Sequence, residues 1–443
     1  MLTAGCTPVC TGATCADRFS LADVRGVVEP SGAFDAEAAT GHIAGRAGDG
    51  RLRSFAPLIG DALLVGVPDG SRVQLYSGSF YLGTEDLELA GEPGEGFGAS
   101  VASATQLVVG APRARAGPLL PSIGRVYVFP YDRPSTLATL GDATQVIDGE
   151  AAADGLGSAV AACGDIDGDG VADVLAAAAD ASDLQGRVVL IPGGSGSGQA
   201  SDLSGWDGDA PGAWLGAALG CGDFDGDGLD DAVIGEPYAA GVAGSGAGAV
   251  LIESVHGELF RLEGAQPNAY FGASLAVGDV DADGVIDLVV GAPGRPSVDA
   301  ATDDLGGAVH VYNGGRLRSA TDLGVLGLGE DARVLGVDTR GRTGDVVATG
   351  DVDGDGVGDV LIGAPGTNPG GSATDVQTGA LYVLPGPFGH GLHPAQRDDR
   401  DVTEATLVIQ GTRVYQRVGE AATLVNLDQA GGAEVIFTTR EEP

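Results

Sequence analysis

Residues 351–365 read DVDGDGVGDVLIGAP, and this stretch decides the fold. Its first nine residues place Asp at positions 1, 3, 5 and 9 and Gly at position 6, and its last six are apolar and end in Gly-Ala-Pro. Near-copies occur at residues 165–179 (DIDGDGVADVLAAAA), 223–237 (DFDGDGLDDAVIGEP) and 279–293 (DVDADGVIDLVVGAP). Four copies with one spacing indicate a repeated structural unit.

Each repeat unit contains four short apolar stretches bounded by Gly and Pro. The first opens with an aromatic-Gly or Leu-Gly pair, the second ends in Gly-Ala-Pro or a variant, and the third resembles Val-Tyr-Val. Short β-branched runs between turn residues predict strands, and the continuously apolar second run predicts a strand buried on both faces. The fourth stretch ends at a glycine that recurs as Gly45, Gly91, Gly149, Gly205, Gly264, Gly336 and Gly411.

The recurring glycine and the opening pair both count seven units. We therefore predict an all-β fold, a seven-bladed β-propeller of four-stranded blades. The last unit has only two strands, and two strand-like pieces, Val24–Glu29 and one ending at Gly45, precede the first complete unit. We expect the N-terminal strands to close the last blade, which hides strand edges. Residues 21–443 then form one propeller, and residues 1–20 an N-terminal tail.

The composition is strongly acidic, with 62 Asp and Glu against 23 basic residues and a formal net charge of −39. Such a surface repels nucleic acid and anionic membranes and attracts cations. Four bound Ca²⁺ ions would add 8 positive charges and leave −31, so calcium does not explain the whole excess. A saline habitat and a genome poor in Lys codons both fit the remainder. The chain has no apolar run long enough for a transmembrane helix, and we expect a monomer.

The Asp-rich loops have the donor set of a calcium site. Ca²⁺ takes six to eight oxygen ligands, and carboxylates at alternate positions of a tight loop converge on one point. Position 6 is Gly, which permits the turn; position 7 offers its backbone carbonyl, with a side chain free to pack inward; and position 9 closes the shell. The predicted ligands are Asp165, Asp167, Asp169, Val171, Asp173; Asp223, Asp225, Asp227, Leu229, Asp231; Asp279, Asp281, Asp283, Val285, Asp287; and Asp351, Asp353, Asp355, Val357, Asp359.

Two alternatives to these calcium loops are weaker. An EF-hand needs Glu at position 12, where this chain has Ala176, Ile234, Val290 and Ile362. Asp-Gly turns without metal would hold four carboxylates together with no cation, which repel one another. A fifth loop at residues 426–434 keeps the spacing but has Ala430 at position 5, so we expect weak binding there or none.

The five cysteines fall into two groups. Cys163 and Cys221 each lie two residues before a calcium loop, and we expect small buried residues there, with a disulfide as the less favoured alternative. Cys6, Cys10 and Cys15 could hold one disulfide, whose pairing stays open. Residues 1–6 are similar to the end of a bacterial lipoprotein signal without its charged and apolar regions.

The combination of an aromatic-Gly pair, Asp-x-Asp-x-Asp-Gly-x-x-Asp and Gly-Ala-Pro, clearest at residues 271–293, resembles the FG-GAP repeat of integrin α-subunits. The resemblance covers roughly residues 21–443. It implies a seven-bladed propeller, calcium in the hairpins of successive blades, and an extracellular or cell-surface role in adhesion or ligand binding. We expect none of the further domains of integrins in this chain, so the resemblance does not imply integrin heterodimer formation.

The sequence shows no catalytic motif: no Gly-x-Ser-x-Gly elbow, phosphate-binding loop or Cys-x-x-Cys pair. We expect a non-enzyme that binds a protein or glycan on the face opposite the calcium loops, where long loops lie. Arg113, Arg115, Arg295 and Tyr238 are candidate contacts, although ordinary solvated loop residues explain them equally well. A polysaccharide-acting enzyme on a propeller scaffold and a purely structural surface module are the alternatives.

Overall fold

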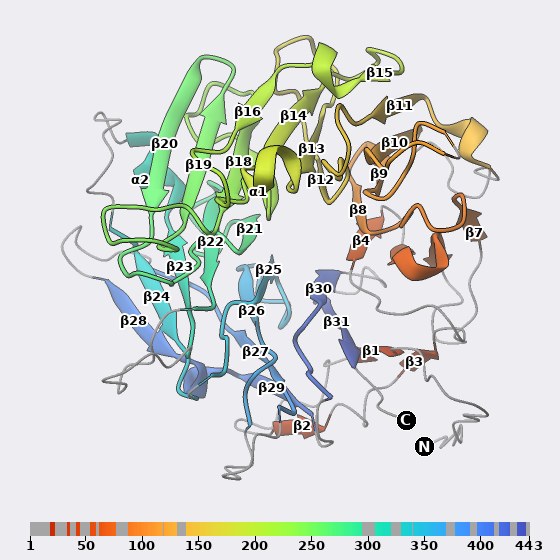
Figure 1. Cartoon of the computed structure of the whole chain (residues 1–443). Helices are drawn as coiled ribbons and strands as arrows, with labels where there is room; N and C mark the ends of the chain where they lie inside the picture. The colour runs from red at the N-terminus through yellow and green to blue at the C-terminus, as the bar shows by residue number, and fades with distance from the viewer. Residues whose placement is uncertain are drawn as a thin grey trace.

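The chain folds as a β-propeller whose sheets stand around a central axis (Figure 1). The computed structural model describes residues 18–22, 33–35, 41–44, 54–58, 62–76, 87–117, 119–130, 139–294, 306–319, 329–338, 340–368, 377–389, 397–411, 416–425 and 432–439. Within them the innermost strands contact one another in a closed ring, β4–β8–β12–β17–β21–β25–β30 and back to β4.

The strands of the described residues form seven sheets, and six of these take four antiparallel strands from one continuous stretch. The first two comprise β4 (Ser54–Leu58), β5 (Ala62–Val67), β6 (Arg72–Tyr76), β7 (Leu87–Ala90) and β8 (Ser100–Ser103), β9 (Gln106–Ala111), β10 (Arg125–Pro130), β11 (Gln145–Asp148). The next two comprise β12 (Ala159–Ala162), β13 (Val174–Ala178), β14 (Arg187–Ile191), β16 (Gly205–Asp207) and β17 (Leu219–Gly222), β18 (Asp231–Glu236), β19 (Ala249–Ser254), β20 (Gly257–Glu263). The last two comprise β21 (Ser274–Gly278), β22 (Asp287–Ala292), β23 (Ala308–Tyr312), β24 (Ala332–Leu335) and β25 (Val346–Gly350), β26 (Asp359–Ala364), β27 (Ala380–Leu384), β29 (Leu407–Gln410).

The seventh sheet combines strands from both ends of the chain. It contains β30 (Ala422–Val425) and β31 (Glu434–Thr439) from the C-terminal end and β1 (Arg18–Ala22) and β3 (Gly41–Ala44) from the N-terminal end. β1 pairs antiparallel with β31, so the N-terminal strands complete this sheet as expected. The N-terminal strand itself was misplaced: β1 begins at Arg18, inside the expected tail, whereas the expected strand Val24–Glu29 lies outside the described residues.

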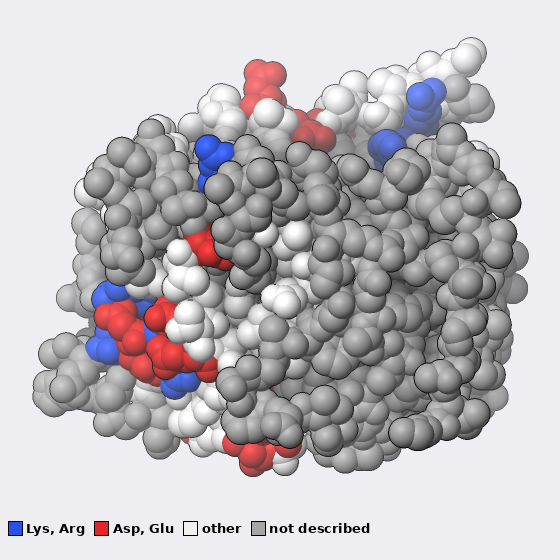
Figure 2. All heavy atoms as spheres, turned by 90° about the horizontal axis from the view of Figure 1, so that it is seen from below, with Lys and Arg blue, Asp and Glu red and all other residues white. Residues whose placement is uncertain are grey.

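Three sheets carry a fifth, parallel strand on the outer edge. β15 (Gly198–Gln199) pairs with β11, β28 (Asp398–Asp401) with β24, and β2 (Ala33–Asp35) with β29. Ion pairs accompany the β24–β28 pairing, including Arg333 Nη2 to Asp399 at 3.0 Å and Arg397 Nη1 to Glu330 at 2.9 Å. Figure 2 shows acidic and basic side chains gathered close together on one face of the molecule. Because much of this rim is solvated, the pairs mainly fix the register of the outer strand.

Among the recurring glycines that the structure describes, the one in the third unit lies at a different place than the sequence count predicts. Gly205 begins β16, and Gly208 takes the place that Gly264 takes in the next sheet. Gly208 donates its N–H to the carbonyl of Gly186 (3.0 Å), as Gly264 donates to Gly248 (2.9 Å). The fourth strand of the third unit therefore ends three residues later than its glycine pattern suggests.

The hydrophobic core is divided among the interfaces between neighbouring sheets. Second strands are buried along their whole length, as expected, in β13, β18, β22 and β26. One apolar cluster joins the first and last sheets, since Leu63 and Val65 of β5 pack in the same cluster as Ile436 of β31. This contact closes the ring by hydrophobic burial, in addition to the backbone pairing of β1 with β31.

Glycine is required where one sheet meets the next. A Cβ on Gly291, in the Gly-Ala-Pro end of β22, would lie 2.1 Å from the carbonyl oxygen of Gly344 in the next sheet. Gly344 itself has φ +89°, a conformation that other residues rarely adopt, and its N–H donates to Gly363 of its own sheet (3.0 Å). The two glycines of the repeat therefore form one backbone-to-backbone contact between neighbouring sheets.

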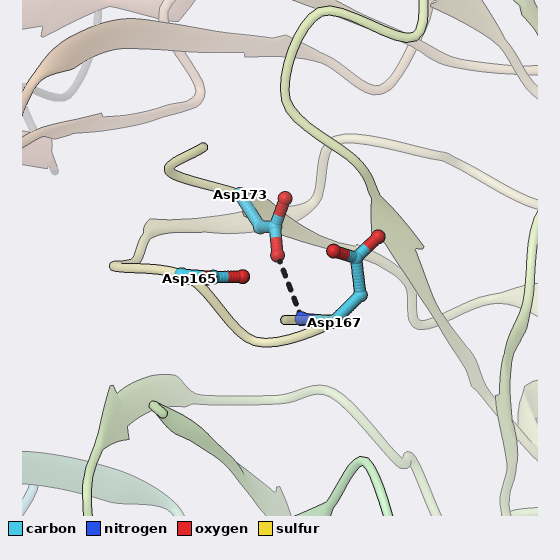
Figure 3. A group of neighbouring side chains, drawn as sticks. All are labelled: Asp165, Asp167 and Asp173. Atoms are coloured by element: carbon cyan, nitrogen blue, oxygen red, sulfur yellow. Dashed lines mark hydrogen bonds between the residues drawn. The ribbon is translucent and has the colours of Figure 1, made fainter. Parts of the chain in front are cut away.

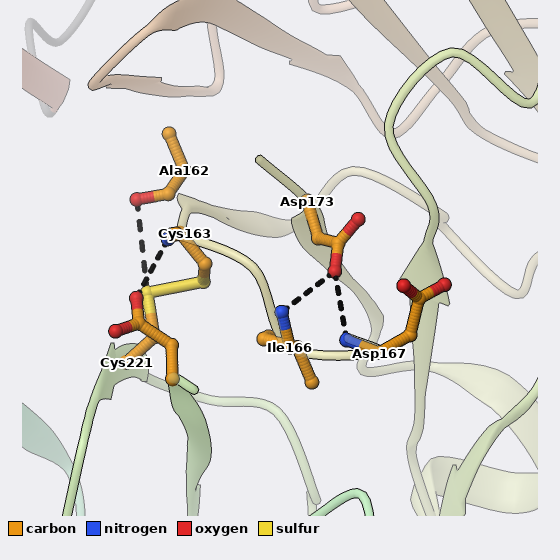
Figure 4. Close-up of a disulfide and its surroundings, with 8 residues drawn as sticks. Ala162, Cys163, Ile166, Asp167, Asp173 and Cys221 are labelled. Carbon is orange, nitrogen blue, oxygen red and sulfur yellow. Dashed lines mark hydrogen bonds between the residues drawn. A yellow bond between two sulfur atoms is a disulfide. The ribbon is translucent and has the colours of Figure 1, made fainter. Parts of the chain in front are cut away.

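A disulfide joins Cys163 to Cys221, contrary to our preference for two separate buried thiols (Figure 4). The Cα atoms are 5.7 Å apart although the residues are 58 positions apart in sequence. Cys163 directly follows β12 and Cys221 lies in β17, and these innermost strands of neighbouring sheets contact each other around the axis. The close approach comes from the ring arrangement, which the spacing alone does not reveal.

We predict that replacing both cysteines by Ser lowers the free energy of unfolding by about 2–4 kcal/mol, because the bridge restricts a loop of this length in the unfolded chain. Chemical denaturation of the double variant beside the parent protein measures this difference. A reducing agent should lower the midpoint of the parent protein and leave the midpoint of the variant nearly unchanged. Equal midpoints for parent and variant would contradict the prediction.

Candidate metal centres

The four Asp-rich loops lie at equivalent places in consecutive sheets. Each joins the first and second strands: β12 to β13, β17 to β18, β21 to β22 and β25 to β26. All four hairpins therefore lie at the same end of the strands. We number them as the first to the fourth loop in chain order.

Backbone hydrogen bonds preform each loop around its first carboxylate. In the first loop, Asp165 Oδ1 accepts from Gly168 N (2.7 Å) and Oδ2 from Gly170 N (2.8 Å). Asp167 accepts from Asp169 N at 3.1 Å. Corresponding bonds occur in the other three loops. These bonds turn the carboxylates of positions 1 and 3 toward the inside of the loop before any ion is considered.

The Asp at position 9 ties the loop to the sheet. Asp173 Oδ2 accepts from the backbone N–H groups of Asp167 (3.2 Å, Figure 3) and Ile166 (2.8 Å, Figure 4). Its Oδ1 accepts from Gly193 N (2.8 Å). Its counterparts Asp231, Asp287 and Asp359 accept from the same backbone position of their own loops at 2.7–2.9 Å. All four of these side chains are buried.

Burial of these carboxylates makes their ionised form costly. Burial, together with the neighbouring Asp carboxylates of each loop, raises the pKa of Asp231 and of Asp287 to about 7, although backbone hydrogen bonds act in the opposite direction. Burial likewise raises the pKa of Asp359 to about 6 and that of Asp173 above its usual value. Each loop thus concentrates negative charge that only a cation or a proton can offset.

The structure brings three carboxylates of each loop together. The groups are Asp165, Asp167 and Asp173; Asp223, Asp225 and Asp231; Asp279, Asp281 and Asp287; and Asp351, Asp353 and Asp355. One oxygen from each member lies within 4.8 Å of the others. Two oxygens bound to one Ca²⁺ are at most about 5 Å apart. The donor set and its spacing therefore fit a calcium ion in every loop.

The remaining predicted ligands lie in the same loops but outside these groups. They are Asp169, Asp227, Asp283 and Asp359, with Val171, Leu229, Val285 and Val357 at position 7. The side chain at position 7, expected to be free to pack inward, is 44% exposed at Val171 and half-buried at Leu229, Val285 and Val357. The residue that anchors each loop is the apolar one at position 2, which the sequence analysis missed: Ile166, Phe224, Val280 and Val352 are all buried. Its apolar character in all four copies was the available signal.

Successive loops are also hydrogen-bonded to each other. The carbonyl of Asp165 accepts from Asp230 N in the second loop (2.8 Å), and the carbonyl of Asp279 accepts from Gly358 N in the fourth (3.1 Å). Position 1 of one loop thus holds position 8 of another, directly before the buried position-9 carboxylate. In the second loop the carbonyl of Asp223 accepts instead from the side chain of Arg318 (2.7 Å).

The opposite end of the strands carries a row of aromatic side chains. Tyr238, one of the expected ligand contacts, is 44% exposed, and its ring centroid lies 5.1 Å from that of Trp214 and 5.0 Å from that of Tyr270. Trp214 and Tyr270 have φ +61° and +53°, conformations that are unfavourable for bulky residues. The sequence analysis missed both, although each directly precedes the Leu-Gly or Phe-Gly pair of its unit.

The other candidate contacts are less distinctive. Arg113 pairs with Asp69 at 3.3 Å and is about half exposed, and Arg115 is an exposed loop residue. Arg295, most of the fifth loop at residues 426–434, and the cysteines at positions 6, 10 and 15 lie outside the described residues. Within the described ranges, no helix has the length and apolar character needed to cross a membrane.

Parts of this chain are similar to a known repeat family and to several known proteins. FG-GAP repeats match at residues 271–312 and 343–384. Integrin alpha-PS2 of Drosophila melanogaster is 35% identical over 188 residues, which is 42% of this chain and 12% of that protein. Phosphatidylinositol-glycan-specific phospholipase D of Bos taurus is 29% identical over 230 residues, 48% of this chain and 25% of that protein. Among solved structures, the Dos1 propeller aligns with a TM-score of 0.43 at 10% identity, over 88% of this chain and 77% of that one.

These relatives are much longer than the matched region, so the chain corresponds to a minor part of each. Further integrin α-subunits match at 30–35% identity over 34–42% of this chain. The two matched repeats, residues 271–312 and 343–384, each contain one Asp-rich loop and its two flanking strands. The chain thus contains FG-GAP repeats and is similar over part of its length to integrin α-subunits.

Proposed function

We propose that this chain is a calcium-stabilised, seven-bladed propeller that binds a protein ligand at the extracellular side of a cell. The observation that carries the calcium assignment is the approach of three carboxylates to within 4.8 Å in each of four equivalent loops. In this proposal each of the seven sheets counts as one blade. The similarity of part of the chain to integrin α-subunits supports ligand binding as the class of function.

Calcium would act on the scaffold and not as a reactive centre. When bound, the ion supplies positive charge to a loop whose carboxylates already point inward. The chain's own residues do the rest: the position-1 Asp organises the turn, the position-9 Asp connects it to the second strand, and the position-2 side chain anchors it in the core. The twenty ligands expected from the sequence, including the position-5 Asp and the position-7 carbonyls, complete the proposed coordination.

The ligand-binding surface in this proposal is the end of the strands opposite the calcium loops. The row of exposed Trp214 and Tyr238 and half-buried Tyr270 supports it, because large aromatic side chains with accessible faces are typical of binding surfaces. Two of the three have a backbone conformation that costs energy, which favours a functional reason for their presence.

An extracellular or cell-surface location fits two observations. The Cys163–Cys221 disulfide forms and persists in oxidising compartments. Calcium sites of extracellular modules have dissociation constants of roughly 0.1–1 mM, which suit the higher calcium concentration outside a cell. The glycan alternative and the lipoprotein signal stay hypotheses from the sequence.

We predict that removing calcium lowers the melting temperature and that added Ca²⁺ restores it by mass action. A hundredfold excess over the dissociation constant of one site contributes about 2.7 kcal/mol. Replacing Asp353 by Asn should remove part of this response, because the fourth loop loses one carboxylate of its group. Thermal unfolding with and without Ca²⁺, with Mg²⁺ as the control ion, measures the effect. Identical melting curves in all conditions would refute the proposed metal sites.

We predict that the stabilisation by calcium grows as the pH rises from 5 to 8. In the metal-free protein, Asp231, Asp287 and Asp359 have a raised pKa in the folded state, so the folded chain binds more protons than the unfolded chain. Their contribution is fully present below about pH 4 and is lost as the pH rises through about 6–7. Metal-free protein, prepared on a chelating resin, is compared with calcium-loaded protein at each pH. A temperature difference that stays constant over this range would contradict the assignment.

We predict that a Trp214→Ala/Tyr238→Ala double variant loses binding to the partner protein by about 2–4 kcal/mol, the usual range for buried aromatic contacts. A screen of immobilised extracellular proteins and glycans with the calcium-loaded chain identifies the partner. Val255→Ser is the matched control, since Val255 is exposed in the β19–β20 hairpin at the calcium end of the strands. Equal binding by both variants would place the contact surface elsewhere.

A further inference from the structure

The second calcium loop differs from the others in what holds its first residue. The carbonyls of Asp165, Asp279 and Asp351 each accept a backbone N–H from position 8 of another loop. The carbonyl of Asp223 accepts from the guanidinium of Arg318, at 2.7 Å from Nη2. A charged side chain therefore stands where the other loops have a neutral amide.

Arg318 comes from a different sheet than the loop it contacts. It lies in helix α2 (Gly314–Ser319), which follows β23, the third strand of the sheet that contains the third loop. Its side chain crosses to the second loop, where Cδ lies 3.5 Å from the position that a Cβ on Gly226 would take. The same Nη2 is 3.3 Å from Asp223 Oδ2, and the two side chains are only 33% and 26% exposed.

Asp223 belongs to the carboxylate group that would hold calcium in this loop, together with Asp225 and Asp231. Arg318 thus contacts a prospective ligand directly through an ion pair. The polar contact of the third loop is different in kind, because the neutral amide of Asn313 donates to Asp281 there. A neutral donor orients a carboxylate without adding a competing charge.

We propose that Arg318 is a resident cation of the second loop and makes it the weakest of the four calcium sites. The proposal rests on the calcium function proposed above. A Ca²⁺ ion that enters the loop meets the guanidinium charge beside Asp223. Either the two positive charges stay close and repel, or the arginine leaves and gives up its hydrogen bond and ion pair. Both routes lower the affinity of this loop for calcium.

The consequence is a graded response to calcium. Three loops would fill at lower calcium concentration, and the second would fill last. In the absence of the ion, Arg318 offsets part of the charge of the second loop and links it to the neighbouring sheet, on the side away from the Cys163–Cys221 disulfide. The arginine therefore takes over in part the role that calcium has in the other loops.

The test is a calorimetric Ca²⁺ titration of the full chain and its Arg318→Gln variant, after metal removal. Gln keeps an N–H donor, on a shorter side chain, and removes the charge. We expect the dissociation constant of the weakest site to fall about tenfold, the order expected for removing one charge beside a partly screened divalent ion. This gain should shrink at 0.5 M salt, because the site is partly exposed.

Two further variants separate the outcomes. Arg316→Gln is the matched control, since Arg316 lies on the same helix but pairs with Asp331 outside the loops, at 3.0 Å. It should leave all dissociation constants unchanged. Asp223→Asn disables the second loop, and adding Arg318→Gln to it should have no further effect on the remaining sites.

Unchanged or weaker binding by Arg318→Gln would overturn the proposal, and so would a gain that persists in the Asp223→Asn background. Far-ultraviolet circular dichroism of each variant confirms that it is folded before titration. An absence of calcium heat in the parent protein would refute the calcium function itself. Normal binding by the parent with no gain in Arg318→Gln would refute only the role of the arginine.

Discussion

The arrangement of the sheets depends on one backbone contact, in which the Gly-Ala-Pro glycine of a sheet meets a glycine carbonyl of the next. The separation leaves no space for a side chain: a Cβ would lie 2.1 Å from that oxygen at Gly110, Gly235 and Gly291. Because the contact recurs at the same place in the sheets that carry this glycine, it sets the same relative position each time, whereas the third sheet has Ala177 at this place. Because these glycines have no side chain, the neighbouring sheets can approach each other closely around the axis.

The calcium loops follow from the same geometry. Once neighbouring sheets are fixed, their first hairpins stand side by side, and the backbone of one loop is hydrogen-bonded to the next, as between Asp165 and Asp230. The cost of this arrangement is electrostatic, because each loop directs carboxylates inward and buries the last one. Burial raises the pKa of Asp231 and Asp287 to about 7, which shows how unfavourable the uncompensated charge is. A bound divalent cation would neutralise the charge of these carboxylates, whereas the dipole of a backbone amide only lowers the electrostatic cost.

Local patterns were predictable from the sequence, and distances across the ring were not. The Asp spacing and the Gly-Ala-Pro ending predicted the hairpins and the buried second strands, because both depend on a few adjacent residues. The disulfide between Cys163 and Cys221 and the contact of Arg318 with Asp223 join different sheets, so spacing carries no signal for them. Position 2 carries a local signal as well, since a buried apolar residue stands between the first two Asp residues of every loop. The strand at Arg18–Ala22 lacks the glycine and proline residues that bound the strands of the repeat, so no comparable pattern predicts it.

The strand β18 runs from the second Asp-rich loop to the aromatic row at the opposite end of the strands. β18 begins at Asp231, the buried carboxylate of the second loop, and ends at Glu236, two residues before the exposed Tyr238. Every residue of this strand is buried, so its position is determined by packing on both sides. Six extended residues span about 20 Å. A cation that fixes the loop therefore fixes the start of the strand that presents the aromatic row, and the weak occupancy inferred for this loop would act on that row more directly than on any other part of the surface.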